Sequence, residues 1–175
     1  METNRREDSL RVAFFLHALE AGGAQKRTAQ LVSSLAALGV AVELVLIDAV
    51  GPNLSELSSA VRVVELRSPF TRMPWIRSRR SRRVFAAVPA LVGYLRRSRP
   101  DVWVAAANHT HFVSLLAQRL AHLESTALVL RLSNTLIEGR SRSSRRSRLW
   151  AARHFYRGAD AIAAWRRDSA TSSCA

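Results

Sequence analysis

The strongest constraint on the fold is a regular alternation of short apolar runs with longer amphipathic runs along most of the 175 residues. A short continuous apolar run is typical of a strand buried on both faces, whereas apolar residues at every third or fourth position indicate a helix. The predicted strands are 11–17, 40–48, 61–66, 102–107, 126–132 and a run that begins at 161. Helical crossovers make such strands parallel. The sequence therefore predicts a doubly wound, Rossmann-like α/β fold, with strands one and four adjacent at the centre.

Helices are predicted between the strands, at 24–38, 84–95, 112–123 and around 145–156. Gly39 stands where the C-terminal cap of the first helix belongs. Pro89 in the second indicates either a kink or a true start near Val88. The segment 67–83 is predicted to be a long, polar and basic connection.

Composition restricts the class of protein. The apolar fraction of 48% suits a globular domain with a core, and the formal charge of +14 favours polyanions or anionic lipid headgroups as partners. Cys174 is the single cysteine, which excludes an intrachain disulfide and a cysteine-based zinc cluster. The apolar run 12–16 is too short for a signal sequence and 84–95 is too short for a membrane span, so we expect a cytoplasmic protein.

Ligands of doubly wound sheets bind at the carboxyl ends of the strands. That rule selects the loops 17–24, 48–53, 108–111 and 133–140. In the first loop, Gly22 and Gly23 precede a helix, and a glycine-lined helix N-terminus attracts phosphate. A tight turn without a ligand is the alternative. The loop has neither the G-x-G-x-x-G fingerprint nor a Walker lysine, which disfavours a dinucleotide dehydrogenase.

Polar side chains follow the fourth and fifth strands. Asn108, His109 and His111 favour hydrogen bonding to a hydroxylated ligand over a metal, since no carboxylate or cysteine stands near them; helix capping is the alternative. Ser133 and Asn134 either bind a ligand or turn the chain. No nucleophile elbow surrounds Ser133 and no carboxylate pair is poised for acid–base work, so the catalytic residues stay unknown.

Arginine dominates the basic residues. One cluster comprises Arg77, Arg79, Arg80, Arg82 and Arg83, and a second comprises Arg140, Arg142, Arg145, Arg146 and Arg148. Nucleic-acid binding is one interpretation, but aromatic stacking platforms are sparse around both clusters. A peripheral, solvated basic face, or one that contacts anionic lipid, is favoured.

The order of these segments resembles the N-terminal half of a family 4 glycosyltransferase, over roughly 11–164. Its landmarks are Gly-Gly-Ala at 22–24, Arg-Pro-Asp at 99–101 and Ala-Asp-Ala-Ile at 159–162. The resemblance implies one half of a GT-B fold, in which an acceptor-binding domain faces a donor-binding domain across a cleft. It also implies hexosyl transfer, with retention, from a nucleotide-diphosphate sugar to a glycan or lipid acceptor. No metal or other cofactor is implied, and polysaccharide or glycolipid biosynthesis is the common setting.

The resemblance also assigns residues by position. It places Gly22, Gly23 and Ala24 at the donor-phosphate and acceptor loop, and Asn108, His109, His111, Ser133 and Asn134 on the acceptor side. Gln25 departs from the family's usual glutamate, and Leu132–Ser133 replaces a frequent Glu-His. We expect peripheral contact with an anionic membrane at the inner face of the cell, and no nucleic acid.

Domain boundaries complete the expectation: a flexible tail at 1–10, the glycosyltransferase domain at 11–164 and an aberrant tail at 165–175. The last segment has neither helical spacing nor a cap, and its composition resembles GC-rich DNA read out of frame. We therefore expect a frameshift near Ala164 and a missing donor domain, which leaves a truncated fragment that is inactive alone. The alternatives are a stand-alone sugar- or nucleotide-binding module and a basic nucleic-acid-binding protein, whose binding would fall steeply with salt.

Overall fold

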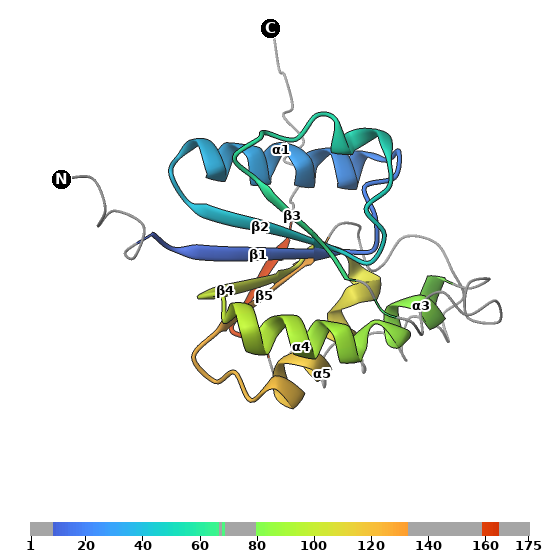
Figure 1. The fold of residues 1–175 in the computed structure, drawn as a ribbon, viewed down its shortest axis with the longest axis vertical. Coiled ribbons are helices and arrows are strands. Elements are labelled where there is room, and N and C mark those ends of the chain that lie inside the picture. Colours follow the sequence, from blue (N-terminus) through green and yellow to red (C-terminus); the bar gives the residue numbers. More distant parts are fainter. Residues whose placement is uncertain (1–8, 67, 69–79, 133–158, 165–175) are drawn as a thin grey trace, which may run out of the picture.

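One parallel sheet organises the molecule (Figure 1). The computed structural model describes residues 9–66, 68, 80–132 and 159–164. The strands are β1 Arg11–Leu16, β2 Ala41–Leu46, β3 Arg62–Glu65, β4 Val102–Ala105, β5 Ala127–Leu132 and β6 Ala161–Ala164. Their order is β3-β2-β1-β4-β5-β6, and every neighbouring pair is parallel. The predicted doubly wound fold is confirmed, with strands one and four paired at the centre through Phe14 and Val104.

Helices cover both faces of the sheet. They are α1 Gly23–Ala37, α3 Arg80–Ala86, α4 Val88–Ser98 and α5 His111–Ala121, with single 3-10 turns η1 Pro52–Leu54 and η3 Asn108–Thr110. Figure 1 shows α1 on one side of the sheet and α3, α4 and α5 on the other. Among the described residues, no helix combines the length and the apolar character that crossing a bilayer requires.

The helix boundaries confirm two expectations and correct a third. Gly39 follows α1 with φ of +85° and its N–H bonded to Ala36, so it ends that helix as predicted. Pro89 lies in the first turn of α4, which begins at Val88; the true start is therefore right and the kink is wrong. The predicted basic connection is wrong from Arg80 onward, because α3 begins there; arginine is a good helix former. The helix expected around 145–156 lies outside the described residues.

The two core layers follow from the alternation of side chains along the central strands. Phe14 and Leu44 are buried on the α1 side, where Val32 packs on them. Phe15 and Trp103 are fully buried on the other side, with ring centroids 5.6 Å apart beneath α4 and α5. Each large apolar side chain buried in this way contributes roughly 1.5–3 kcal/mol.

A polar cluster at the amino end of the sheet ties α4 to β2. Glu43 accepts hydrogen bonds from the hydroxyls of Tyr94 and Ser98, the latter at 3.0 Å, and pairs with Arg62 at 2.9 Å. Burial, followed by the hydrogen bond to Glu43, raises the pKa of Tyr94, so the phenol stays a neutral donor. This cluster lies at the edge opposite the carboxyl ends of the strands and fixes the helix layer against the sheet.

Candidate functional site

The switch point of this topology lies between β1 and β4. These neighbouring strands lead into α1 and α5, which lie on opposite faces of the sheet (Figure 1). Loops that leave adjacent strands in opposite directions open a cleft at the carboxyl edge, and doubly wound proteins bind ligands there. The loops after β1, β2 and β4 meet at this edge, as the sequence predicted.

The loop between β1 and α1 is held by the loop after β2. The N–H of Leu19 donates to the carbonyl of Val50 at 3.1 Å, and the amide of Asn53 donates to the carbonyl of Glu20 at 2.8 Å. Gly51 has φ of +126°, and a Cβ built there would lie 2.0 Å from the carbonyl oxygen of Leu19. Only glycine permits this approach. Sequence reasoning identified 48–53 as a loop of the site and missed its bracing role.

The first turn of α1 is open to solvent and carries no negative charge. Gly22 is the N-cap residue, no side chain caps the turn, and its first turn contains no acidic residue. Gly22 and Gly23 are exposed, and a Cβ built on Gly23 would meet no atom within 4 Å. Unpaired N–H groups and the positive end of the helix dipole make such a turn suited to an anion.

Two arginines strengthen the positive potential at this turn. Arg131, on β5, donates to the hydroxyl of Thr28, which in turn donates to the carbonyl of Ala24 at 2.8 Å. Burial lowers the pKa of Arg131, and repulsion by Arg27 lowers it further, although a guanidinium stays charged in proteins. Sequence reasoning missed Arg131 and Thr28. The only signal was an arginine inside the apolar run of the fifth strand.

A second polar group lies at the ends of β1 and β2. His17 is 7% exposed, and its Nε2 lies 3.6 Å from Oδ2 of Asp48. Arg83, on α3, donates to the other oxygen of Asp48. This contact corrects the prediction that the first arginine cluster is wholly peripheral, because the Arg83 side chain is only 22% exposed. The ring of His109 lies edge-on to that of His17, with centroids 6.4 Å apart.

The residues expected after β4 divide between the surface and the interior. Asn108 and His109 lie in η3, where His109 is exposed. His111 begins α5, is 3% exposed and places Nε2 at 3.1 Å from the carbonyl of Arg131. Burial lowers the pKa of His111, so the neutral ring joins α5 to β5. Neither η3 nor α5 has a side-chain cap, although Thr110 donates to the carbonyl of Ala107.

The remaining predicted site residues have simpler outcomes. Ala24 lies in the first turn of α1. Ser133 and Asn134 directly follow β5 and lie outside the described residues. In the described ranges, no three histidine, cysteine, aspartate or glutamate side chains gather as a metal site would require.

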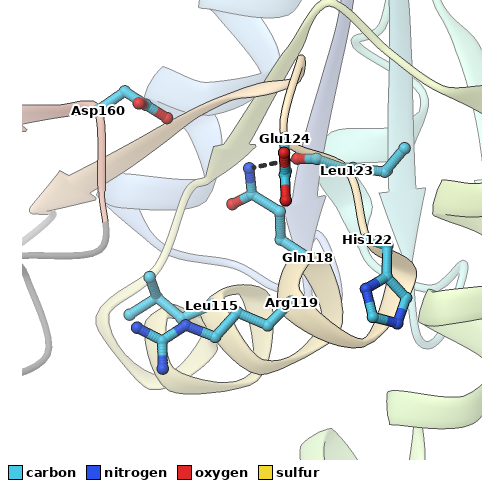
Figure 2. A pocket seen from close by; sticks show the side chains of 7 residues that line it. All are labelled: Leu115, Gln118, Arg119, His122, Leu123, Glu124 and Asp160. Atoms are coloured by element: carbon cyan, nitrogen blue, oxygen red, sulfur yellow. Dashed lines mark hydrogen bonds between the residues drawn. The ribbon is translucent and has the colours of Figure 1, made fainter.

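A cavity of about 300 Å³ lies away from this site, at the end of α5 (Figure 2). It is lined by polar groups that hold the helix to the sheet. Nε2 of Gln118 donates to the carbonyls of Leu123 and Thr126 at 3.2 and 2.6 Å, and Asp160 accepts the N–H of Leu128 at 2.7 Å. These contacts lie at the amino ends of β5 and β6. The Gly22–Gly23 loop lies at the opposite, carboxyl edge of the sheet, so the cavity is separate from the site.

The fold and the site together define a Rossmann-like domain with an open, glycine-lined helix N-terminus at its switch point. A family model described as "Glycosyl transferase 4-like domain" matches residues 22–171, and the chain belongs to that family. The family resemblance noted in the sequence is confirmed. No curated protein sequence matches the chain significantly.

Solved structures of glycosyltransferases share the fold at low sequence identity. Sucrose-phosphate synthase from Thermosynechococcus elongatus is 19% identical, with a TM-score of 0.59 over 87% of this chain and 41% of its own. A glycosyltransferase from Rickettsia africae ESF-5 is 12% identical, with a TM-score of 0.57 over 89% and 37%. The glycosyltransferase SnogD from Streptomyces nogalater is 16% identical, with a TM-score of 0.52 over 90% and 43%. The chain thus spans less than half of each and has the fold of one half of a GT-B enzyme.

Proposed function

We propose that the chain is the acceptor-side domain of a retaining glycosyltransferase that takes a hexose from a nucleotide-diphosphate sugar. Membership of the glycosyl transferase 4-like family and the GT-B half-fold support this assignment. The observation that carries it is the open first turn of α1 at the switch point of the sheet: a Cβ built on Gly23 meets no atom within 4 Å, and Arg131 bonds to Thr28 further along the same helix.

The donor diphosphate approaches the first turn of α1. Gly23 presents its backbone N–H with no side chain in the way, whereas the side chain of Gln25 lies against Gly22; Ala24 follows with a small side chain. Arg27 and Arg131, which lie close enough to repel each other, add positive charge near this end of α1. Hydrogen bonds to a charged partner are worth about 1.5–3 kcal/mol each, so a few such contacts hold a phosphate weakly until the donor half of the enzyme contributes its own.

The glycan or lipid acceptor lies against the loop after β4. Asn108 and His109 present hydrogen-bonding groups there, and we also assign Ser133 and Asn134, which follow β5 in the sequence, to the acceptor. The His17–Asp48 pair, which lies next to His109, adds polar groups at the same edge of the sheet. Imidazole, amide and hydroxyl groups suit the many hydroxyls of a sugar.

Transfer needs both halves of a GT-B enzyme. Because this chain spans about two fifths of the enzymes that it resembles, we infer that the 175 residues alone do not transfer sugar. No metal or other cofactor is assigned. We place the protein in the cytoplasm, where nucleotide sugars and glycolipid or polysaccharide acceptors meet at the inner face of the membrane.

An NMR titration of the chain with inorganic pyrophosphate and, separately, with neutral oligosaccharides tests the assignment. We expect pyrophosphate to shift amide signals of the first turn of α1, and an accepted oligosaccharide to shift those of η3. Saccharide binding should persist as salt is added. A steep fall of all binding with salt, together with binding to DNA or RNA, would identify a nucleic-acid-binding protein instead. Robust sugar transfer by the chain alone would contradict the inferred inactivity.

A further inference from the structure

Two aromatic side chains lie half-exposed and in contact beside the acceptor loop. Phe85, on α3, and Phe112, in the first turn of α5, are 50% and 40% exposed, with ring centroids 5.6 Å apart and planes tilted by 54°. Single exposed apolar residues are common on soluble proteins. Here, however, two large rings from separate helices meet at the surface. They form a continuous apolar surface that we name the Phe85–Phe112 surface.

The helix that carries Phe85 is strongly basic. Residues 80–86 contain three arginines and no acidic residue. Arg83 is engaged by Asp48 inside the site, while Arg80 and Arg82 add two further charges to the same seven-residue helix. Arg77 and Arg79 precede it in the sequence. An acidic bilayer has an anionic headgroup surface over an apolar interior. An apolar pair of side chains on a basic helix complements such a bilayer.

The position of the surface connects it to the site. Phe112 comes directly after His111, and η3, with Asn108 and His109, immediately precedes α5. Helix α3 contacts η3 and holds Asp48 through Arg83. A bilayer that received both phenylalanines would therefore lie next to the loop to which we assign the acceptor.

We propose that the Phe85–Phe112 surface inserts into the headgroup region of an anionic bilayer, with α3 lying on the lipid phosphates, and that the acceptor reaches the site from that bilayer. The part of this inference that concerns the acceptor rests on the proposed function. The membrane contact itself rests only on the Phe85–Phe112 surface. Transfer of a phenylalanine side chain out of water is favourable in free energy whatever the lipid charge. An arginine side chain is stabilised only by the negative surface potential of an anionic bilayer. The two residue types therefore predict different responses to lipid composition.

Co-sedimentation of the full chain with vesicles tests the contact. The probes are vesicles of phosphatidylcholine alone and of an equimolar mixture of phosphatidylcholine and phosphatidylglycerol. We expect binding to the anionic vesicles only, and a loss of about tenfold in partitioning for Phe85→Ser and for Phe112→Ser. Leu120→Ser is the matched control, since Leu120 is 46% exposed on the same helix as Phe112 and about 12 Å further along its axis. This control should bind as the unmodified chain does.

A charge series separates the contribution of α3 from the overall charge. Arg80→Gln with Arg82→Gln should weaken binding by roughly fivefold for each arginine removed. Arg97→Gln with Arg99→Gln removes the same charge at the far end of α4, where both residues are exposed, and should have a smaller effect. Equal losses from the two pairs would show attraction by net charge alone and would overturn the proposal.

Hydrogen exchange of the unmodified chain keeps the test independent of how the variants fold. Anionic vesicles should protect the amides of 83–87 and 111–114 and leave those of 118–122 unchanged. Absence of that protection, or equal binding by Phe85→Ser and the unmodified chain, refutes the contact. The proposal is also refuted if the double variant Arg80→Gln with Arg82→Gln loses binding to a DNA duplex but still binds vesicles. The surface would then recognise nucleic acid. Vesicle binding requires no sugar transfer, so failure of the proposed function leaves this result readable.

Discussion

The two glycines Gly23 and Gly51 are predicted to respond to the same substitution in opposite ways. Gly23 is the first residue of α1, and an added Cβ meets nothing within 4 Å. Gly51 has φ of +126°, and its Cβ would lie 2.0 Å from the carbonyl oxygen of Leu19. If the first is kept open for a ligand and the second for the fold, Gly23→Ala should change binding and Gly51→Ala should change stability.

The magnitudes follow from the two environments. Alanine is favoured over glycine by up to about 1 kcal/mol within a helix, so Gly23→Ala should leave the melting temperature unchanged or raise it by up to about 4 °C. Backbone strain and the close contact at Gly51 each cost on the order of 1–3 kcal/mol. A total near 3 kcal/mol lowers the melting temperature of a domain of this size by about 6–12 °C.

The effect on binding comes from one methyl group. It would extend about 1.5 Å from the Cα of Gly23, where the diphosphate is proposed to approach. Loss of one hydrogen bond to a charged group costs about 1.5–3 kcal/mol, so we expect at least roughly a tenfold weaker affinity for pyrophosphate in the NMR titration. The larger Gly23→Val should weaken it further.

Thermal unfolding and the pyrophosphate titration, run on both variants, separate the two roles. Unchanged affinity in Gly23→Ala would show that the Gly-Gly loop is only a turn. A melting temperature that falls in Gly23→Ala as far as in Gly51→Ala would refute the assignment of open space at that position.

Three further substitutions test the electrostatics of the site. Arg131→Gln keeps a donor for Thr28 and removes the charge, so pyrophosphate should bind roughly tenfold more weakly; equal affinity would refute its role. Asp48→Asn leaves the largely buried Arg83 without its counter-charge and should lower stability by about 3–5 kcal/mol in urea unfolding, whereas a change below about 1 kcal/mol would mean a solvent-screened pair. His111 has a lowered pKa in the fold, so the unfolded chain binds more protons as pH falls below about 6.5, and stability should fall with it. His111→Gln should flatten that part of the stability curve, and an unaltered curve would contradict the shift.

The fold was largely predictable because the signals that specify it are local. Continuous apolar runs marked the strands, and each predicted strand is present within a residue or two of its expected ends. Gly39 and Pro89 marked the end of α1 and the start of α4 through backbone constraints that belong to those residues alone. Helix α3 was missed because the charge of its arginines suggested a solvated loop. Arginine is in fact a good helix former.

The site was predictable only as a set of loops. The strand-end rule located Gly22, Gly23, Asn108 and His109 at the edge where the structure places them. It grouped His111 with them as an acceptor-binding residue, although the buried ring contacts the backbone carbonyl of Arg131 on β5. A side chain that follows a strand faces either the ligand-binding edge or the core, depending on the backbone dihedral angles of one or two residues. The type of residue does not predict those angles.

The sequence by itself determined the parallel sheet, the alternation of layers and the glycine-lined start of α1, because hydrophobic periodicity and glycine geometry act over a few neighbouring residues. Only the tertiary structure decided which charges meet. Arg131 lies 103 positions from Thr28 in the chain, and Arg83 lies 35 from Asp48. Such pairs form because the order β2-β1-β4-β5 brings distant strand ends to one edge and α3 packs against it. Their partners are therefore selected by packing across the whole sheet, which no local pattern records.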